Sequence, residues 1–193
     1  MSMFEHITKS GKFIRVYDDL LPFPVVNRLY HDLRKESFPI AVQNDVALQD
    51  QVGKFGFGKL MSTPAFLKDV VNMKDAVNAF PLQAYLNRCQ PEKCWVNLFT
   101  GYDVARFHGD WHNGDYVSLL YYANDKWDIN WDGGTLFRSD DLSEVELYVD
   151  YKPGRFVLFN SGIPHKAVST SHSSAYYRYT INSVYINHNL TTA

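Results

Sequence analysis

The sequence predicts a mainly β fold, in which a double-sheet core is flanked by α-helices. Three observations lead to this prediction. The chain is rich in aromatic residues, with 13 Tyr, 13 Phe and 4 Trp, and such residues suit β-strands. Helical patterns are confined to the part of the chain before residue 91. Short strand-like segments separated by turns follow them, which is typical of a sandwich or barrel buttressed by helices.

Before residue 91, the apolar pattern predicts a strand followed by helices. Lys12–Tyr17 alternates apolar and polar residues, as a half-buried strand does. A helix is expected over Pro24–Leu33, where apolar residues recur at helical spacing. Pro64–Val77 follows the capping hydroxyls of a Ser-Thr pair and predicts a second helix. Pro81 should end that helix, and a short further helix is expected to run to Cys89.

The segment Gln43–Lys59 lies between these helices and lacks their periodicity. It contains three glycines around Phe55 and Phe57, together with polar residues. This composition is typical of a mobile loop or of a hairpin. Such a segment can act as a lid over a binding site, or it can be a plain surface connection. Both interpretations are kept open.

After Pro91, the pattern changes to short strands. Turn residues at Trp131–Gly134 and Lys152–Gly154 separate some of them. Gly133 and Gly134 should mark a tight bend or a close backbone approach. The strands are expected over Trp95–Phe99, Val117–Tyr122, Glu144–Val149, Arg155–Phe159 and Tyr179–Ile186.

Composition bears on partners and location. The net charge of -2 gives no bulk electrostatic reason to bind nucleic acid. No run of 18 apolar residues is present, so no membrane span is expected. The N-terminus lacks the basic and apolar regions of a secretory signal, and we expect a cytoplasmic protein. Cys89 and Cys94 match neither a CxxC redox motif nor a four-ligand zinc site, so reduced thiols are expected.

A metal site is suggested by His108 and Asp110, which lie two residues apart near a strand end, and by His165 further along. Two histidines and one carboxylate on one face form the facial triad of non-haem iron(II) oxygenases. Three ligands on one face leave open positions for a bidentate 2-oxo acid and for dioxygen. A His-x-Asp pair also arises by chance, and His112 and His172 are alternative ligands.

Arg178 begins the last predicted strand and gives this site independent support. An arginine can pair bidentately with the distal carboxylate of a dicarboxylic co-substrate, which lysine does less specifically. The alternative is a surface arginine paired with an Asp or Glu. However, the flanking Tyr177, Tyr179 and Ile181 predict a half-buried strand, where an unpaired cation is costly.

At this point, the sequence resembles the prolyl 4-hydroxylase-like branch of the 2-oxoglutarate/iron(II) oxygenases. The resemblance covers about Trp95 to Ile186 and consists of several weak motifs in family order. These motifs are Asn97–Gly101, His108–Asp110, Leu119–Asn124 with Trp127, Gly133–Leu136, Pro153–Arg155 with Val157–Phe159, His165, and Arg178–Asn182.

The resemblance implies a double-stranded β-helix, a jelly-roll fold related to the cupins. It implies that iron binds His108, Asp110 and His165, and that Arg178 binds the distal carboxylate of 2-oxoglutarate. By the same resemblance, the Tyr122 hydroxyl reaches that carboxylate too, while Tyr121 should then point to the opposite face. We expect Asn182, four residues after Arg178, to line the same pocket. A polar residue of the strand ladder is the alternative for Asn182.

The sequence departs from the family pattern at Phe99, where tyrosine is common. A phenyl ring cannot donate a hydrogen bond, so Phe99 is not expected to bind the co-substrate, and Tyr102 is the nearby alternative. Trp127 and Trp131 are read as packing residues rather than substrate contacts.

The expected organisation is a single domain over residues 1–193. Residues 1–90 would provide helical support and a lid region, and residues 91–188 the β-helix core with the metal site. The resemblance implies a dioxygenase that consumes 2-oxoglutarate and O2 with iron(II), and with ascorbate as a reductant. It would hydroxylate an unactivated C–H bond and release succinate and CO2.

The substrate would be a peptide or protein, with a prolyl residue as the first candidate, or a small molecule. Its specificity is expected to reside in Gln43–Lys59 and in Trp111–Tyr116. Two other classes remain: a non-catalytic cupin-like module that binds a metal or small ligand, and a structural jelly roll without metal.

Overall fold

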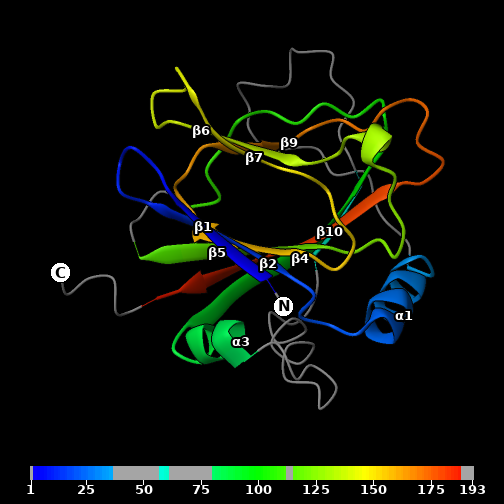
Figure 1. Cartoon of the computed structure of the whole chain (residues 1–193), viewed down its shortest axis with the longest axis horizontal. Coiled ribbons are helices and arrows are strands. Elements are labelled where there is room, and N and C mark those ends of the chain that lie inside the picture. Colours follow the sequence, from blue (N-terminus) through cyan, green and yellow to red (C-terminus); the bar gives the residue numbers. More distant parts are fainter. Residues whose placement is uncertain (1, 37–56, 61–79, 112–114, 188–193) are drawn as a thin grey trace.

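The computed structural model describes residues 2–36, 57–60, 80–111 and 115–187. Within these residues, the chain forms a large antiparallel sheet, a small antiparallel sheet and a few short helices (Figure 1). The predicted helix over Pro64–Val77 and residues 43–56 of the predicted lid lie outside the described residues.

The large sheet follows the order β1-β2-β8-β5-β10-β4-β3, with every neighbouring pair antiparallel. The small sheet follows the order β7-β6-β9. The strands of the large sheet are β1 Ser2–Ile7, β2 Phe13–Asp18, β3 Phe57–Leu60, β4 Gln90–Phe99, β5 Tyr116–Tyr122, β8 Phe156–Asn160 and β10 Arg178–Ile186. Those of the small sheet are β6 Thr135–Arg138, β7 Val145–Val149 and β9 His165–Ala167.

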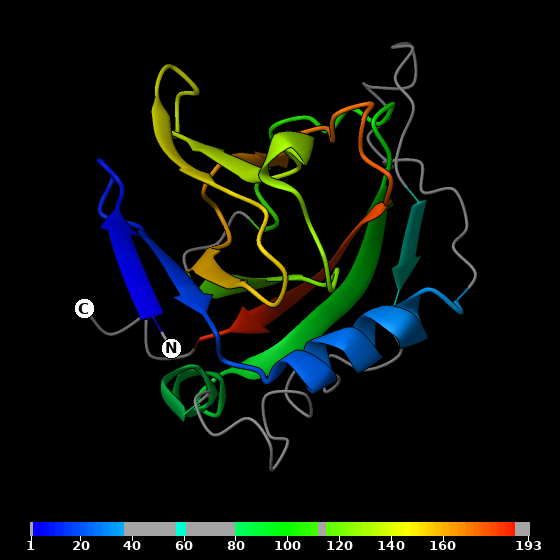
Figure 2. The ribbon, with the colours of Figure 1, turned by 45° about the vertical axis from the view of Figure 1, so that its right-hand side comes forward.

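Helices cover the outer face of the large sheet (Figure 2). The helix α1, Phe23–Leu33, buries five apolar residues at helical spacing. Together with α3, Phe80–Leu86, it packs on one set of alternating strand residues, which includes Leu119, Tyr121 and Ile181. A short 3-10 helix, η3 Ile129–Trp131, precedes the small sheet. No helix in the described part of the chain is long and apolar enough to cross a membrane.

The inner face of the large sheet faces the small sheet and forms a second apolar cluster. Leu120 and Tyr122 belong to this inner cluster, whereas Tyr121 belongs to the outer one. Successive strand residues point to opposite faces, so the prediction that Tyr121 and Tyr122 diverge is confirmed. The same alternation on β10 sends Arg178 and Asn182 inwards, into the space between the sheets.

The predicted strands of the C-terminal half are all present, as is the helix α1. Three strands, β1, β6 and β9, were not predicted, and β3 lies at the end of a segment for which a loop or a hairpin was expected. β1, β2 and β3 all belong to the large sheet, although the sequence assigned residues 1–90 to helical support and a lid. The predicted bend at Gly133 and Gly134 is confirmed. Gly133 has φ +83°, and a Cβ on Gly134 would lie 2.5 Å from the Val149 carbonyl oxygen.

Candidate metal site and adjoining pocket

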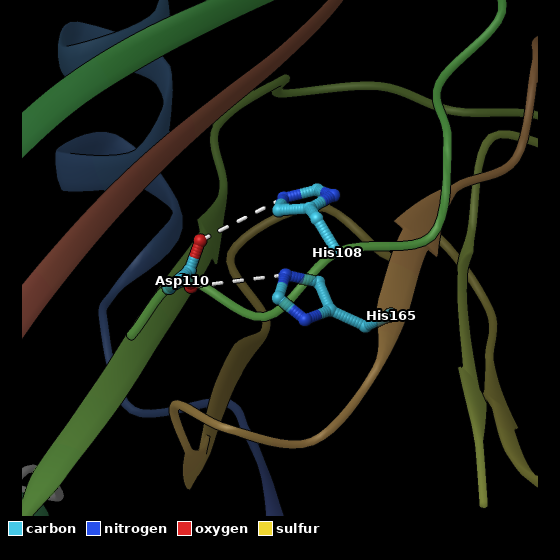
Figure 3. Close-up of side chains that lie close together, drawn as sticks. All are labelled: His108, Asp110 and His165. Carbon is cyan, nitrogen blue, oxygen red and sulfur yellow. Dashed lines mark ion pairs between the residues drawn. The ribbon is translucent and has the colours of Figure 1, made fainter. Parts of the chain in front are cut away.

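His108, Asp110 and His165 converge between the two sheets (Figure 3). The Nε2 atoms of both histidines lie 3.7 Å from the Asp110 carboxylate, His108 from Oδ1 and His165 from Oδ2. One ligand atom from each residue can be chosen so that all three lie within 4.8 Å of one another. This is the predicted set of two histidines and one carboxylate, with the donor atoms turned towards a common point.

The backbone brings these residues together although they are far apart in the sequence. His108 and His165 form an antiparallel bridge, in which each amide donates to the other's carbonyl at 3.1 and 2.9 Å. The Asp110 amide donates to the Ser161 carbonyl at 2.9 Å. Between the two ligands, a Cβ on Gly109 would lie 3.3 Å from that same carbonyl oxygen. The close Ser161 carbonyl therefore leaves little room for a larger side chain at position 109.

Each side chain is also oriented by hydrogen bonds. Nδ1 of His108 lies 2.9 Å from the Arg106 carbonyl, and Nδ1 of His165 lies 2.9 Å from the Ile163 carbonyl. A proton on Nδ1 leaves Nε2 as the metal-binding atom, which is how metal-ligating histidines are usually fixed. Asp110 Oδ2 accepts from Ser118 Oγ at 2.6 Å and from Asn182 Nδ2 at 3.2 Å.

Burial favours the neutral form of His165. Removal from water lowers the pKa of this histidine, and the nearby His108 acts in the same direction. The Asp110 carboxylate and the Ile163 carbonyl oppose this effect without reversing it. A neutral imidazole is the form that binds a metal. The donor set thus fits a divalent metal with three protein ligands and open positions.

A pocket of about 340 Å³ adjoins His108, Asp110 and His165. Its volume lies within the usual range for small-molecule sites. One wall is the inner face of β4 and β10, and the opposite side comes from the loop before β5 and from the small sheet. The lining residues are Lys93, Trp95, Asn97, Phe99, Val104, Ala105, His108, Gly109, Asp110, Leu120, Thr135, His165, Ala167, Arg178, Thr180 and Asn182.

Arg178 places a buried cation in this pocket, with only 2% of the residue exposed. Its Nε donates to the Gly133 carbonyl, and its guanidinium carbon lies 5.4–5.8 Å from the ring centres of Phe99, Tyr122 and Tyr151. No Asp or Glu among the described residues pairs with it. Burial lowers the pKa of Arg178, although arginine remains charged at neutral pH. The guanidinium therefore lacks a counter-charge from the described part of the chain.

The other predicted pocket residues are placed as follows. Asn182 lines the pocket, where it contacts Asp110. Tyr122 lies behind the lining, and its hydroxyl donates to Thr135 Oγ1 at 2.8 Å. Burial raises the pKa of Tyr122 to about 12. Phe99 lines the pocket beside Arg178, whereas Tyr102 is 68% exposed and is not part of the lining.

The alternative ligand His172 lies apart from the three ligands and packs against Tyr102, with the two ring centres 4.8 Å apart. His112 lies outside the described residues. Trp127 packs on Tyr151, with ring centres 4.3 Å apart, and its Nε1 donates to the Asp132 carbonyl, which supports its reading as a packing residue.

Several residues of the site were not predicted from the sequence. Ser118 donates to Asp110, Thr135 and Thr180 line the pocket together with Arg178, and Lys93 and Trp95 line the wall formed by β4. The strand alternation carried a signal for Ser118, Trp95 and Thr180, which lie in predicted strands, but not for Thr135 or Lys93, which lie outside them. Residues that share a face with Tyr122 on β5, or with Phe99 on β4, had to point inwards.

No family model matches the sequence, and no curated protein matches it either. Solved structures do match its fold. One is a prolyl hydroxylase in complex with a hypoxia inducible factor oxygen degradation domain peptide fragment from Trichoplax adhaerens. It is 17% identical, with 93% of this chain and 87% of that chain covered and a TM-score of 0.60.

Two further structures have similar scores. A Pseudomonas putida prolyl-4-hydroxylase is 18% identical, covers 91% of this chain and 92% of its own, and has a TM-score of 0.59. HygX from Streptomyces hygroscopicus, with nickel and 2-oxoglutarate bound, is 13% identical, covers 91% and 83%, and has a TM-score of 0.62. The chain therefore has the double-stranded β-helix fold of the 2-oxoglutarate- and iron(II)-dependent oxygenases.

Proposed function

We propose that the protein is a 2-oxoglutarate- and iron(II)-dependent dioxygenase that hydroxylates an unactivated C–H bond and releases succinate and CO2. One observation carries the proposal. Within this fold, a His-Asp-His set and a buried arginine without a described carboxylate partner face the same pocket. Burying a cation without a counter-charge costs folding free energy. A module that bound only a metal would gain nothing from such a cation, whereas a dicarboxylate ligand would neutralise it.

The residues of the chain have separate tasks in this proposal. His108, Asp110 and His165 hold the iron, and Ser118 and Asn182 fix the carboxylate of Asp110. Arg178 pairs with the distal carboxylate of 2-oxoglutarate, and Thr135 and Thr180 offer hydroxyl groups near it. When bound, iron(II) supplies the activation of O2 through oxidative decarboxylation of the co-substrate. Phe99 and Leu120 are apolar walls that limit water around the co-substrate.

A prolyl residue of a peptide or protein is the first substrate that we propose to test. The support is the fold shared with prolyl hydroxylases. HygX, which has the same fold, is described with hygromycin B bound, so small molecules are tested alongside peptides. Ascorbate belongs in these assays as the reductant that would sustain turnover.

An anaerobic titration of the metal-free protein with iron(II) and 2-oxoglutarate tests the proposal. Chelation should give a visible metal-to-ligand charge-transfer band, and His165→Ala should abolish it. Arg178→Lys should keep iron binding but need at least about ten-fold more 2-oxoglutarate, since lysine cannot form the bidentate pair. Succinate formation in air then tests turnover. A folded, iron-bound protein that gives no band would instead be a cupin-like binding module.

A further inference from the structure

The pocket extends past the metal ligands, and the strand register fixes the order of its residues. On β4, the lining residues Phe99, Asn97, Trp95 and Lys93 alternate along one face. They pair in turn with Arg178, Thr180, Asn182 and Val184 on β10. Arg178 therefore lies at one end of this wall and Lys93 at the other.

The metal ligands lie between these two ends. Asn182 donates to Asp110, and Asn182 is the strand partner of Trp95. Asn182 lies four positions after Arg178, or about 13 Å along an extended strand. A co-substrate that joins the metal to Arg178 occupies that stretch. Trp95 and Lys93 are left for another molecule, with Lys93 about 7 Å beyond the level of the metal ligands.

Lys93 gives this remaining part of the pocket a positive charge. Lys93 is exposed, and its Nζ lies 5.2 Å from the ring centre of the half-buried Trp95, in a cation–π contact between two residues that line the pocket. No Asp or Glu in the described part of the chain forms an ion pair with it. Glu92, its neighbour on β4, should point to the opposite face.

The charges in the pocket identify the complementary ligand. This step rests on the function proposed above. The positive charge of bound iron(II) offsets the negative charge of 2-oxoglutarate, and the charge of Asp110 offsets that of Arg178. Lys93 therefore gives the pocket a net positive charge. We propose that Lys93 and Trp95 form the primary-substrate subsite, and that they select a substrate bearing a carboxylate. The carboxylate pairs with Lys93, the adjoining apolar part packs on Trp95, and the reacting carbon lies on the side of the metal.

Two probes of equal shape test this selection. Hydrocinnamate and hydrocinnamide differ mainly in charge, and both carry a flat apolar group for Trp95. Their affinities are measured by calorimetry on protein loaded with zinc, which takes the same ligands without redox chemistry. Saturating 2-oxoglutarate keeps Arg178 occupied. The wild type should bind hydrocinnamate about five-fold more tightly than hydrocinnamide, as an exposed charge pair allows.

Variants assign the preference to a residue. Lys93→Gln should reduce the ratio of the two affinities to about one, and Lys93→Glu should invert it. Trp95→Leu should weaken both probes alike. Lys35→Gln, at an exposed lysine that pairs with Asp32 at the end of α1, is the matched control and should keep the wild-type ratio.

The outcomes separate this inference from the proposed function. Protein that binds neither zinc nor 2-oxoglutarate contradicts the proposed function itself. Protein that binds both, but has equal affinity for the two probes or keeps its preference in Lys93→Gln, overturns the role of Lys93 alone. Competition between hydrocinnamate and 2-oxoglutarate also overturns it, because the probe would then occupy the Arg178 end.

Discussion

At the scale of single residues, the orientation of Asp110 depends on Ser118, whose hydroxyl donates to Oδ2 at 2.6 Å. Ser118→Ala removes this bond and should lower the affinity for zinc or iron(II) about ten-fold, a typical effect of losing a group that orients a metal ligand. Competition with a chelator measures that affinity. Ser183→Ala is the control, because Ser183 is equally buried but donates to Cys94 on the outer face. Equal losses in both variants would contradict the role of Ser118.

The backbone at Gly133 fixes Arg178. The Gly133 carbonyl accepts a hydrogen bond from Arg178 Nε, and the φ of +83° at Gly133 is unfavourable for other residues. A Cβ there would also lie 3.0 Å from the Trp127 ring and 3.3 Å from Arg178 Cδ. Gly133→Ala should therefore lower the free energy of unfolding by about 1–3 kcal/mol and weaken 2-oxoglutarate binding.

Gly11→Ala is a matched control for this prediction. Gly11 has φ +79°, but a Cβ there would meet no atom within 4 Å. It should show the backbone cost alone, about 1 kcal/mol in urea unfolding, with unchanged 2-oxoglutarate affinity. If both variants lost the same stability and bound 2-oxoglutarate normally, crowding around Gly133 would be irrelevant to Arg178.

At the scale of elements, Asp18 at the end of β2 is tied to Arg155, which precedes β8. Arg155 donates from Nε and Nη2 to the two carboxylate oxygens at 2.7 and 2.9 Å. Burial alone would raise the pKa of Asp18, but Arg155 and Lys152 outweigh it and hold the pKa below its usual value. Because the pKa of the folded state is depressed, the stabilisation is present above about pH 4, the unfolded value. It is lost as the pH falls through the folded value.

Asp18→Asn removes this titration and should lower the free energy of unfolding near neutral pH by about 1–3 kcal/mol. Urea unfolding at pH 7, 5 and 3 measures the difference from the wild type. The difference should hold between pH 7 and 5 and shrink towards pH 3, because below about pH 4 the unfolded chain binds a proton at Asp18 more readily than the folded chain does. A constant difference at all three values would show that Asp18 acts through packing rather than charge.

The elements also show what the sequence could predict. Strands such as β5 and β10 are long and rich in aliphatic and aromatic residues, and these were predicted because the local pattern is strong. β9 has three residues and β6 has four, too few for a periodic pattern. They exist because each pairs with a distant strand, so their structure is set by tertiary contacts.

The same limit applies to the site. His108, Asp110, His165 and Arg178 carry chemistry in their side chains and stood out in the sequence. Ser118 did not, because a serine in a strand has no distinctive pattern. It matters only because Asp110 and Ser161 come to lie beside it. The three candidate ligands could be proposed from the sequence, whereas the groups that orient them depend on the folded arrangement.

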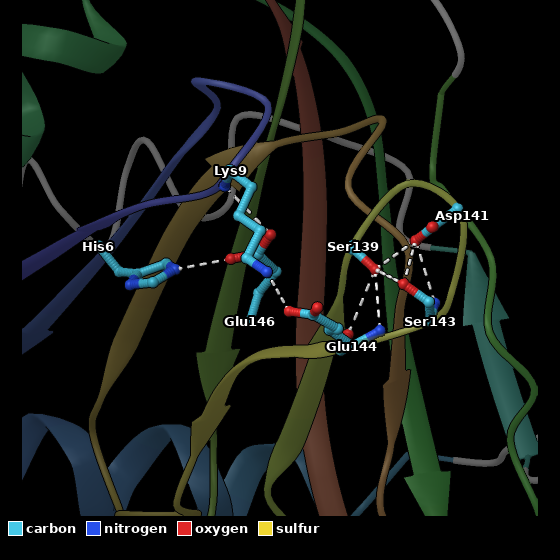
Figure 4. Close-up of polar contacts among 7 residues, drawn as sticks. All are labelled: His6, Lys9, Ser139, Asp141, Ser143, Glu144 and Glu146. Atoms are coloured by element: carbon cyan, nitrogen blue, oxygen red, sulfur yellow. Dashed lines mark hydrogen bonds and ion pairs between the residues drawn. The ribbon is translucent and has the colours of Figure 1, made fainter.

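At the scale of the whole molecule, the two sheets must be held at a fixed separation for the ligands to converge. The turn of the β1–β2 hairpin contacts the β6–β7 hairpin and joins the sheets at one edge (Figure 4). Glu146 on β7 accepts from the Lys9 amide and from His6 Nε2, both at 3.1 Å, and its side chain is only 6% exposed. Glu144 pairs with the Lys9 ammonium, and its side chain is 57% exposed.

These two glutamates permit a test of how the sheets are joined. Glu146→Ala leaves the Lys9 amide and His6 without their acceptor and should cost about 1–3 kcal/mol of unfolding free energy. Glu144→Ala removes an exposed ion pair and should leave the free energy of unfolding nearly unchanged, because water screens the pair. Urea unfolding measures both, and metal affinity shows whether the effect reaches the site.

A larger loss in Glu144→Ala would mean that the exposed charges, and not the buried acceptor, hold the hairpins together. The other informative result is a Glu146→Ala variant that is both less stable and weaker in metal binding. That result would mean that the contact between the two hairpins helps to set the distance from β9, which carries His165, to the large sheet, which carries Ser118 and Asn182.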